Sequence, residues 1–456
     1  MIHADDRELR REMYSAWVTR ASDQGPAAGT YDNTANMRRI LSLRAEESRL
    51  LGFGSFADVS LATKMAEHPR EVLDFLHGLV RRVRPAAEQE FRELESFART
   101  ELELDTLAAW DIAWAAEKLR KARFDISQEE LRPYFPLPKV LDGMFAIVGK
   151  LYGMEVRETD VPSAWHPSVR FFEIRDASGS LRGQLYMDLY ARPQKRGGAW
   201  MDEVLNRFRT DKGLQTPVAH LCCNFGEPAG NKPALLTHDE VQTLFHEFGH
   251  CLHHLLTQVD YPSAAGINGV EWDAVELPSQ FHENFTWDRD ALDLISGHVA
   301  SGESVPVELH EKMLASRTFH AGLFLVRQLE FALFDMQLHS SGTMDFESVL
   351  KSVREEVSVI PVPAFNRFAH SFAHIFAGGY AAGYYSYLWA EVMSSDAFAA
   401  FEEAGLFDRS TGTRFLTAVL ERGGSASARE LFEAFRGRQP QEDAFLRQHG
   451  IVAADI

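Results

Sequence analysis

The chain has 456 residues, of which 45% are hydrophobic and 25% charged, a balance typical of a globular enzyme with a large buried core. Acidic residues outnumber basic ones by 66 to 47, which gives a formal net charge of −19. Because no basic block interleaved with aromatic residues is present, nucleic acid is excluded as the expected partner.

Cysteine usage and the N-terminal residues favour a reducing compartment. Cys222, Cys223 and Cys251 show no C-x-x-C spacing, so a disulfide framework is not expected. Residues 1–10 contain no apolar stretch of the kind found in signal peptides, and no run of residues reaches the length of a membrane span. The sequence therefore predicts a cytoplasmic location.

Residues from about Asp5 to Tyr152 repeat apolar positions at helical spacing. We expect breaks between these helices at Pro69, Pro85 and Pro133. The predicted domain organisation is a helical region over 1–160 and a catalytic region over 161–456, packed as one integrated unit.

Strand signals are concentrated between residues 169 and 225. Residues 169–174 and 181–190 flank the turn residues 176–179, which predicts a β-hairpin, and residues 218–224 form a third expected strand. From residue 239 onward the pattern is helical again. The expected fold class is therefore mainly α, with many helices and a small β-sheet.

The most informative stretch is His246-Glu247-Phe248-Gly249-His250. Residues four apart lie above one another on a helix, so the imidazoles of His246 and His250 can reach a single metal ion, with Glu247 close to a metal-bound water. Thr237 and Glu240 form a predicted capping box, which indicates where this helix begins. The pattern predicts a zinc hydrolase with a small sheet next to its zinc-binding helix.

A catalytic zinc site normally has three protein ligands, and the third is open at this point. Position 256 is Leu256, which excludes the metzincin spacing. His253 lies roughly 10 Å from His246 along the helix axis, too far to share one ion. The remaining candidates are acidic or amide side chains that would share one helical face, and spacing does not rank them: Asp273, Glu276, Gln280 and Glu283.

A third group of residues extends from His374 to Tyr387 and contains three glycines within six residues. Glycines allow a loop to bend and approach a ligand, and tyrosine and histidine supply hydrogen-bond donors. Such donors suit the oxyanion that develops when an amide bond is hydrolysed.

Five stretches together resemble the thimet oligopeptidase family of zinc metallopeptidases: 246–250, 273–280, 374–387, 21–26 and 196–202. The likeness extends over essentially the whole chain. It implies that Glu276 is the third ligand, so that His246, His250 and Glu276 bind one Zn²⁺ ion. Glu283 and Gln280 then become residues that could orient a ligand histidine.

The resemblance also implies catalytic roles. Glu247 would be the general base, and His374 and Tyr387 would stabilise the transition state. Tyr380 and Tyr384 match substrate-binding tyrosines of the family's glycine-rich loop. The implied activity is a zinc-dependent endopeptidase that hydrolyses short peptides, and no membrane partner is expected.

The chain departs from the family pattern at its N-terminus, where members usually carry a further helical region that helps enclose a channel. Residues 1–160 would then form only part of the channel wall, and a complementing subunit is one expectation. The alternatives are a dipeptidyl carboxypeptidase of the same family and a non-catalytic zinc protein that binds peptides or a partner.

Overall fold

The computed structural model describes residues 2–124, 126–228, 230 and 232–451. Two compact units are formed from interleaved parts of the chain. The first unit comprises 1–125, 315–388 and 446–456, and the second comprises 126–314 and 389–445. The division expected from the sequence, at residue 160, stays a prediction.

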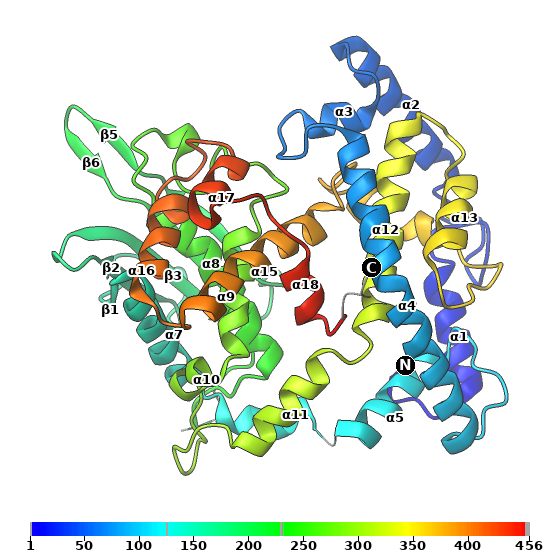
Figure 1. Ribbon diagram of the computed structural model, residues 1–456, viewed down its shortest axis with the longest axis horizontal. Helices are drawn as coiled ribbons and strands as arrows, with labels where there is room; N and C mark the ends of the chain where they lie inside the picture. The colour runs from blue at the N-terminus through cyan, green and yellow to red at the C-terminus, as the bar shows by residue number, and fades with distance from the viewer. Residues whose placement is uncertain (1, 125, 229, 231, 452–456) are drawn as a thin grey trace. The chain divides into compact units, whose positions relative to one another are not determined.

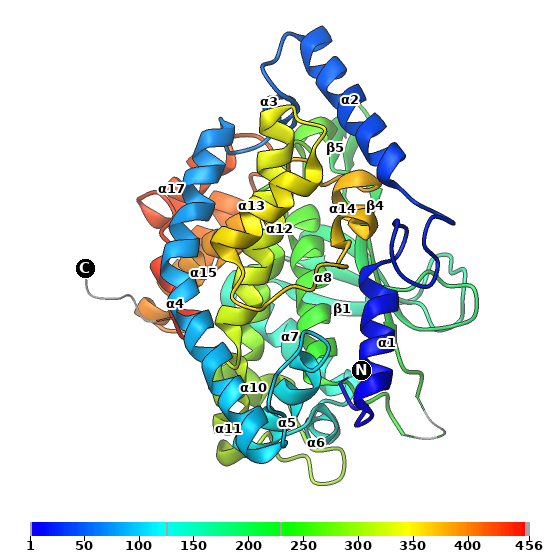
Figure 2. The same cartoon turned by 90° about the vertical axis from the view of Figure 1, so that its right-hand side faces the viewer.

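The first unit is helical. Its helices are α1 (Arg7–Val18), α2 (Thr34–Leu51), α3 (Phe56–Leu61), α4 (Pro69–Glu101), α5 (Ile112–Phe124), α12 (Ala321–Ser341), α13 (Phe346–Val357) and α14 (Ala373–Phe376) (Figure 1). Figure 2 shows α4, α12 and α13 lying alongside one another, in agreement with their contacts.

The expected helix break at Pro85 is wrong, because α4 continues through this residue. Proline in a helix interior removes one backbone hydrogen bond, but burial along one face of α4 offsets that loss. The buried residues of that face include Val72, Leu76, Leu79, Val83 and Ala87. Pro69, in contrast, occupies the start of α4, where its missing N–H costs nothing.

The second unit contains the sheet and the helix that carries His246 and His250. Its helices are α6 (Gln128–Leu131), α7 (Leu137–Tyr152), α8 (His238–Leu255), α9 (Leu277–Glu283), α10 (Arg289–Ile295), α16 (Arg409–Phe415) and α17 (Ala428–Arg436). Three further helices contain residues of both units: α11 (Val307–Arg317), α15 (Ser386–Ala404) and α18 (Asp443–Gln448).

Five strands form one mixed sheet in the order β1-β2-β3-β7-β4. The strands are β1 (Glu155–Thr159), β2 (Arg170–Arg175), β3 (Leu181–Tyr190), β7 (Val218–Phe225) and β4 (Trp200–Leu205), and a separate pair is formed by β5 (Phe208–Thr210) and β6 (Gly213–Gln215). The predicted hairpin is confirmed as antiparallel β2 and β3, and the predicted third strand is β7, which runs parallel to β3.

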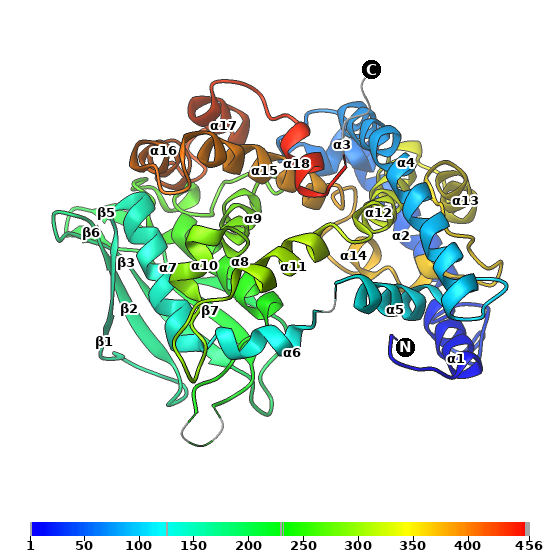
Figure 3. The same ribbon diagram turned by 60° about the horizontal axis from the view of Figure 1, so that its bottom comes forward.

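Helices α7 and α8 cover one face of this sheet (Figure 3). Phe145 of α7 joins them, because its ring lies 5.3 Å from Phe172 of β2 and 5.9 Å from Phe248 of α8, measured between ring centroids. The predicted mainly helical fold with a small sheet beside the zinc-motif helix is thus confirmed. In the described part of the chain, no helix is both long and apolar enough to span a bilayer.

Candidate metal centre and active site

Helix α8 begins as the sequence predicted. The Thr237 hydroxyl accepts a hydrogen bond from the Glu240 N–H at 3.1 Å, and the Glu240 carboxylate accepts one from the Thr237 N–H at 2.8 Å. This reciprocal capping box satisfies two backbone donors that the first turn would leave unpaired. After the first turn, one side of α8 packs against the sheet. This packing fixes the direction in which the side chains on the opposite side of the helix point.

Three side chains converge beside α8. The carboxylate of Glu276 lies with Oε2 3.0 Å from Nε2 of His250 and 3.3 Å from Nε2 of His246. One ligand atom from each of the three residues lies within 4.8 Å of the other two. Two imidazole nitrogens and a carboxylate oxygen at this separation are a donor set that suits a tetrahedral Zn²⁺ with one open position.

Glu276 is the residue immediately before α9, at its N-cap position. The expected helical face that included Asp273 is wrong, because the helix begins only at Leu277 and Asp273 precedes it. Proline at the second position of α9 favours a helix start there rather than a helix running through it. The geometry brings Glu276, and not Asp273, to the two histidines.

Gly249 allows α9 to lie close enough for this contact. A Cβ atom at Gly249 would lie 2.6 Å from the carbonyl oxygen of Pro278 and 2.7 Å from Cα of Ser279. Both of these atoms are backbone, so a larger residue would force the two helices apart. The motif alone indicates no role for Gly249, although a glycine within a helix is itself a sign of close packing.

Two further residues hold the converging groups. Oε1 of Glu283 lies 2.6 Å from Nδ1 of His246, and the Ser279 hydroxyl donates to Oε2 of Glu276 at 2.9 Å. Hydrogen bonds of this kind orient metal ligands and set which imidazole nitrogen faces the ion. Glu283 had been expected in such a position, whereas Ser279 had not, although it lies only three residues from Glu276.

The electrostatics favour a cation between these groups. Burial disfavours the charged imidazole of His246, but its hydrogen bonds to Glu276 and Glu283 outweigh burial and raise its pKa to about 10. Burial likewise disfavours the charged carboxylate of Glu276, and the two histidines outweigh it and lower its pKa. Positive charge is therefore strongly attracted to this point.

Glu247 is only 7% exposed and faces the same region. Burial raises its pKa, while the neighbouring His246 and His250 lower it in part. A backbone hydrogen bond from Met201, on the edge strand β4, also favours the charged form. A carboxylate with a raised pKa is suited to take up and release a proton near neutral pH.

His253 is not among the converging residues, in agreement with the sequence argument. It is 3% exposed, and burial lowers its pKa to about 3, so it is a neutral ring within the core. Gln280 also lies on α9, without a place in the group of possible metal ligands among the described residues.

The histidine and tyrosines of the glycine-rich segment belong to the other unit and form their own aromatic cluster. His374 packs edge-on against Tyr384, with ring centroids 5.5 Å apart. Tyr380 stacks on Tyr387 at 5.0 Å, and the Tyr384 hydroxyl donates to Gln328 at 2.9 Å. The structure thus brings together the three predicted metal ligands in one unit, and the four predicted donors and substrate-binding residues in the other.

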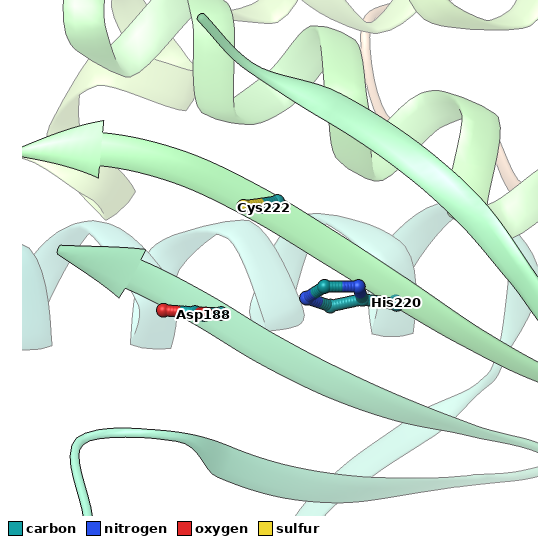
Figure 4. A group of neighbouring side chains, drawn as sticks. All are labelled: Asp188, His220 and Cys222. Atoms are coloured by element: carbon teal, nitrogen blue, oxygen red, sulfur yellow. The ribbon is translucent and has the colours of Figure 1, made fainter. Parts of the chain in front are cut away.

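A second group with metal-ligand side chains lies on the sheet. Asp188 of β3 and His220 and Cys222 of β7 lie on neighbouring strands (Figure 4), and one potential ligand atom from each lies within 4.8 Å of the others. Alternation along the strands places them on the opposite side from Cys223, whose thiol is on the side of Glu247.

Protein cations already neutralise this second group. Both oxygens of Asp188 accept from Arg192, at 2.6 and 2.7 Å, and they also accept from Lys195 and Trp165 at 2.9 Å each. Burial alone would raise the pKa of Asp188, but these hydrogen bonds outweigh it and lower the pKa. A divalent ion would have to enter beside two positive side chains, so we interpret the group as a structural ion-pair cluster.

The fold is one found in peptidases. A solved structure entitled PZ peptidase A with inhibitor 2 superposes with a TM-score of 0.60 and 15% sequence identity, covering 98% of this chain and 68% of the other. At this level of identity the likeness concerns the fold alone.

Sequence comparison gives the family. Residues 1–451 match the profile of peptidase family M3. Oligopeptidase A of Escherichia coli (strain K12) is 53% identical over 456 residues, covering 99% of this chain and 67% of the relative. Dipeptidyl carboxypeptidase of Salmonella typhimurium (strain LT2) is 35% identical, covering 98% and 65%.

The chain therefore belongs to peptidase family M3, and it spans about two thirds of the length of these relatives. The resemblance inferred from the motifs is confirmed, as is the prediction of a metallo-oligopeptidase. The higher identity to oligopeptidase A favours this activity over that of a dipeptidyl carboxypeptidase.

Replacing Gly249 by Ala tests how the converging geometry is built. The added methyl group would press on the backbone of Pro278 and Ser279 and move Glu276 away from the histidines. We expect zinc affinity, measured by competition with a chromophoric chelator, to fall by about 10- to 100-fold, as for the loss of a ligand-orienting contact.

The matched control is Gly149→Ala in α7, where the nearest atom to an added Cβ lies 3.4 Å away. This variant should bind zinc as the parent chain does. Equal zinc affinity in all three proteins would show that the close approach at Gly249 is not what brings Glu276 to the metal.

Proposed function

We propose that the protein is a zinc-dependent endopeptidase that hydrolyses short peptides, with His246, His250 and Glu276 as the ligands of one Zn²⁺ ion. The observation that carries the proposal is the convergence of these three donors next to a buried carboxylate, Glu247. When bound, zinc would supply a Lewis acid that polarises the scissile carbonyl and lowers the pKa of water.

Glu247 is proposed as the group that moves protons. With its pKa raised by burial, the carboxylate accepts a proton from the attacking water and passes it to the leaving amine. Glu283 is proposed to hold His246 through Nδ1, which keeps Nε2 of that ring directed at the metal.

His374 and Tyr387 are proposed to donate hydrogen bonds to the oxyanion that forms on the scissile carbonyl, where one such donor is commonly worth about 3 kcal/mol. Tyr380 and Tyr384 are proposed to contact the peptide. Burial raises the pKa of Tyr384 to about 12, so its phenol remains a donor at neutral pH. A peptide carbonyl would have to replace Gln328 as the acceptor of that hydroxyl.

We further propose that the peptide binds in an extended form along β4. This strand is the last in the sheet order and pairs on one side with β7. Its Met201 N–H bonds to Glu247, which connects the edge of the sheet to the proposed base. Main-chain hydrogen bonds to an edge strand select for an extended backbone rather than for particular side chains.

A cytoplasmic location is also proposed, and the three free cysteines, all buried, support it. A complementing subunit stays a prediction that no contact among the described residues addresses.

Replacing Glu247 by Gln separates metal binding from catalysis. The amide cannot accept the proton of water, so kcat should fall by about 10²- to 10⁴-fold while one zinc per chain is retained. Elemental analysis and peptide turnover measure the two quantities. The control Glu240→Gln lies on the same helix and keeps its capping box, and it should remain active. Undiminished hydrolysis by the Glu247 variant would remove this residue from the mechanism.

Chelation and product analysis test the metal and the cleavage mode together. Removing the metal should abolish hydrolysis of a ten-residue peptide, and adding back stoichiometric Zn²⁺ should restore it, because two imidazoles and one carboxylate favour this ion. Mass spectrometry should then show internal cuts. Successive release of C-terminal dipeptides would instead identify a dipeptidyl carboxypeptidase, and persistent activity in the metal-free protein would contradict the proposed metal dependence.

A further inference from the structure

The end of the glycine-rich segment is held by a buried carboxylate from a different helix. Asp335, in α12, is 0% exposed. Its Oδ1 accepts the backbone N–H of Ala382 at 2.8 Å, and its Oδ2 accepts those of Gly383 and Tyr384 at 2.9 Å each. Three successive amides that converge on one anion form a concave backbone site of the kind that binds anions, here occupied by a side chain.

The clamped backbone is also strained. Ala382 has a φ of 48°, in the left-handed region that a non-glycine residue adopts only where its surroundings fix it. On the other side of the same backbone, the Ser60 hydroxyl donates to the carbonyl oxygens of Ala381 and Ala382, at 2.9 and 3.1 Å. Amides and carbonyls of the turn are thus both held by side chains from outside the segment.

Asp335 is itself fixed by a chain of polar contacts. Nδ1 of His339 lies 2.9 Å from Oδ1 of Asp335, and Nη1 of Arg44 lies 2.9 Å from Nε2 of His339. A guanidinium only donates, so Nε2 accepts and the imidazole proton is on Nδ1, which donates it to the backbone carbonyl of Asp335 at 2.9 Å. His339 thus holds the backbone of Asp335 and lies beside its carboxylate, and neither His339 nor Arg44 takes part in the turn.

The glycine-rich segment consequently has two unlike halves. Residues 377–379 are exposed and include Gly378 and Gly379, whereas residues 381–386 are buried. The clamp lies wholly in the buried half, directly before α15, the helix that begins at Ser386 and carries Tyr387. The side-chain contacts from Asp335 and Ser60 thus hold the buried half of the segment.

We propose that Asp335 is a positioning residue for the hydrolytic reaction. By holding three amides of the turn, it fixes the backbone that carries Tyr384 and leads into Tyr387, so these phenols keep their places while the exposed glycines adapt to a peptide. This inference rests on the proposed function, in which Tyr387 donates a hydrogen bond to the oxyanion. Asp335 does not itself touch the substrate.

The test compares Asp335→Asn with Asp396→Asn in the full chain. Asparagine has the same shape, but its NH₂ group cannot accept the amide hydrogens that one carboxylate oxygen accepts now. Asp396 is a suitable control, because it is 1% exposed, accepts a backbone N–H from Gln441, and pairs with Arg436 and Arg438.

For Asp335→Asn we expect kcat to fall by at least about 10-fold, since displacement of a catalytic group by about 1 Å costs up to about 100-fold. The zinc content and KM should stay close to those of the parent. Asp396→Asn should lower the melting temperature but leave kcat of the folded protein unchanged. An unchanged kcat in Asp335→Asn, or an equal loss in both variants, would overturn the proposal.

A double-mutant cycle with Tyr387→Phe distinguishes positioning from a general loss of structure. If Asp335 acts by placing Tyr387, adding Asp335→Asn to the Phe variant should lower kcat by less than about 3-fold, because linked residues are not additive. A full further loss in the double variant would overturn the inference but leave the donor role of Tyr387 intact. An unchanged kcat in Tyr387→Phe alone would refute the donor role first, and the inference with it.

Ser60→Ala provides a second route if Asp335→Asn does not fold. It removes the bonds to the carbonyls of Ala381 and Ala382 and leaves the carboxylate in place. We expect a smaller fall in kcat, by about 3- to 10-fold, again absent in the Tyr387→Phe background. A kcat equal to that of the parent would count against the clamp.

Discussion

The close approach of α8 and α9 is the constraint on which the proposed metal centre depends. Two histidines four residues apart are fixed by α8 alone, but the third donor comes from the start of a different helix. That helix can lie near enough only because position 249 has no side chain, so that the backbone of Pro278 and Ser279 in the first turn of α9 lies against it. The same contact places Glu283, the last residue of α9, against Nδ1 of His246.

The charge balance follows from this packing. Glu276, Glu283 and Glu247 bring three carboxylates to two imidazoles. Against the opposing effect of burial, the hydrogen bonds of His246 to Glu276 and Glu283 raise its pKa to about 10, so this ring binds an additional proton. A divalent ion has to displace that proton, so metal binding would be coupled to proton release and weaken as the pH falls. The ion-pair cluster at Asp188 shows the opposite arrangement, since Arg192 and Lys195 supply its positive charge permanently.

Local patterns were read correctly from the sequence. The capping box at Thr237, the β2–β3 hairpin and the spacing of His246 and His250 each depend on residues a few positions apart, so their signals survive in the sequence. Glu276 could be chosen over Glu283 only by family resemblance, because the direction of each carboxylate depends on where α9 begins and how it packs. The break expected at Pro85 failed for the same reason, as burial along α4 outweighs a local preference.

The role of Asp335 could not be predicted from a sequence motif. An acidic residue inside the apolar sequence of α12 nevertheless indicates that hydrogen-bond donors or a positive charge must compensate its carboxylate. Its partners are backbone amides nearly fifty residues away, and every residue type except proline has such an amide, so the sequence does not identify them. The two sets of proposed active-site residues each lie within one unit. The ligands are on α8 and at the start of α9, and the proposed donors are on α14 and in the first turn of α15. Each set is held by its own buried polar contacts, so a substitution in one need not disturb the geometry of the other. The peptide that both sets are proposed to contact would couple them, and variants combined across the two units, measured with substrate present, test that coupling.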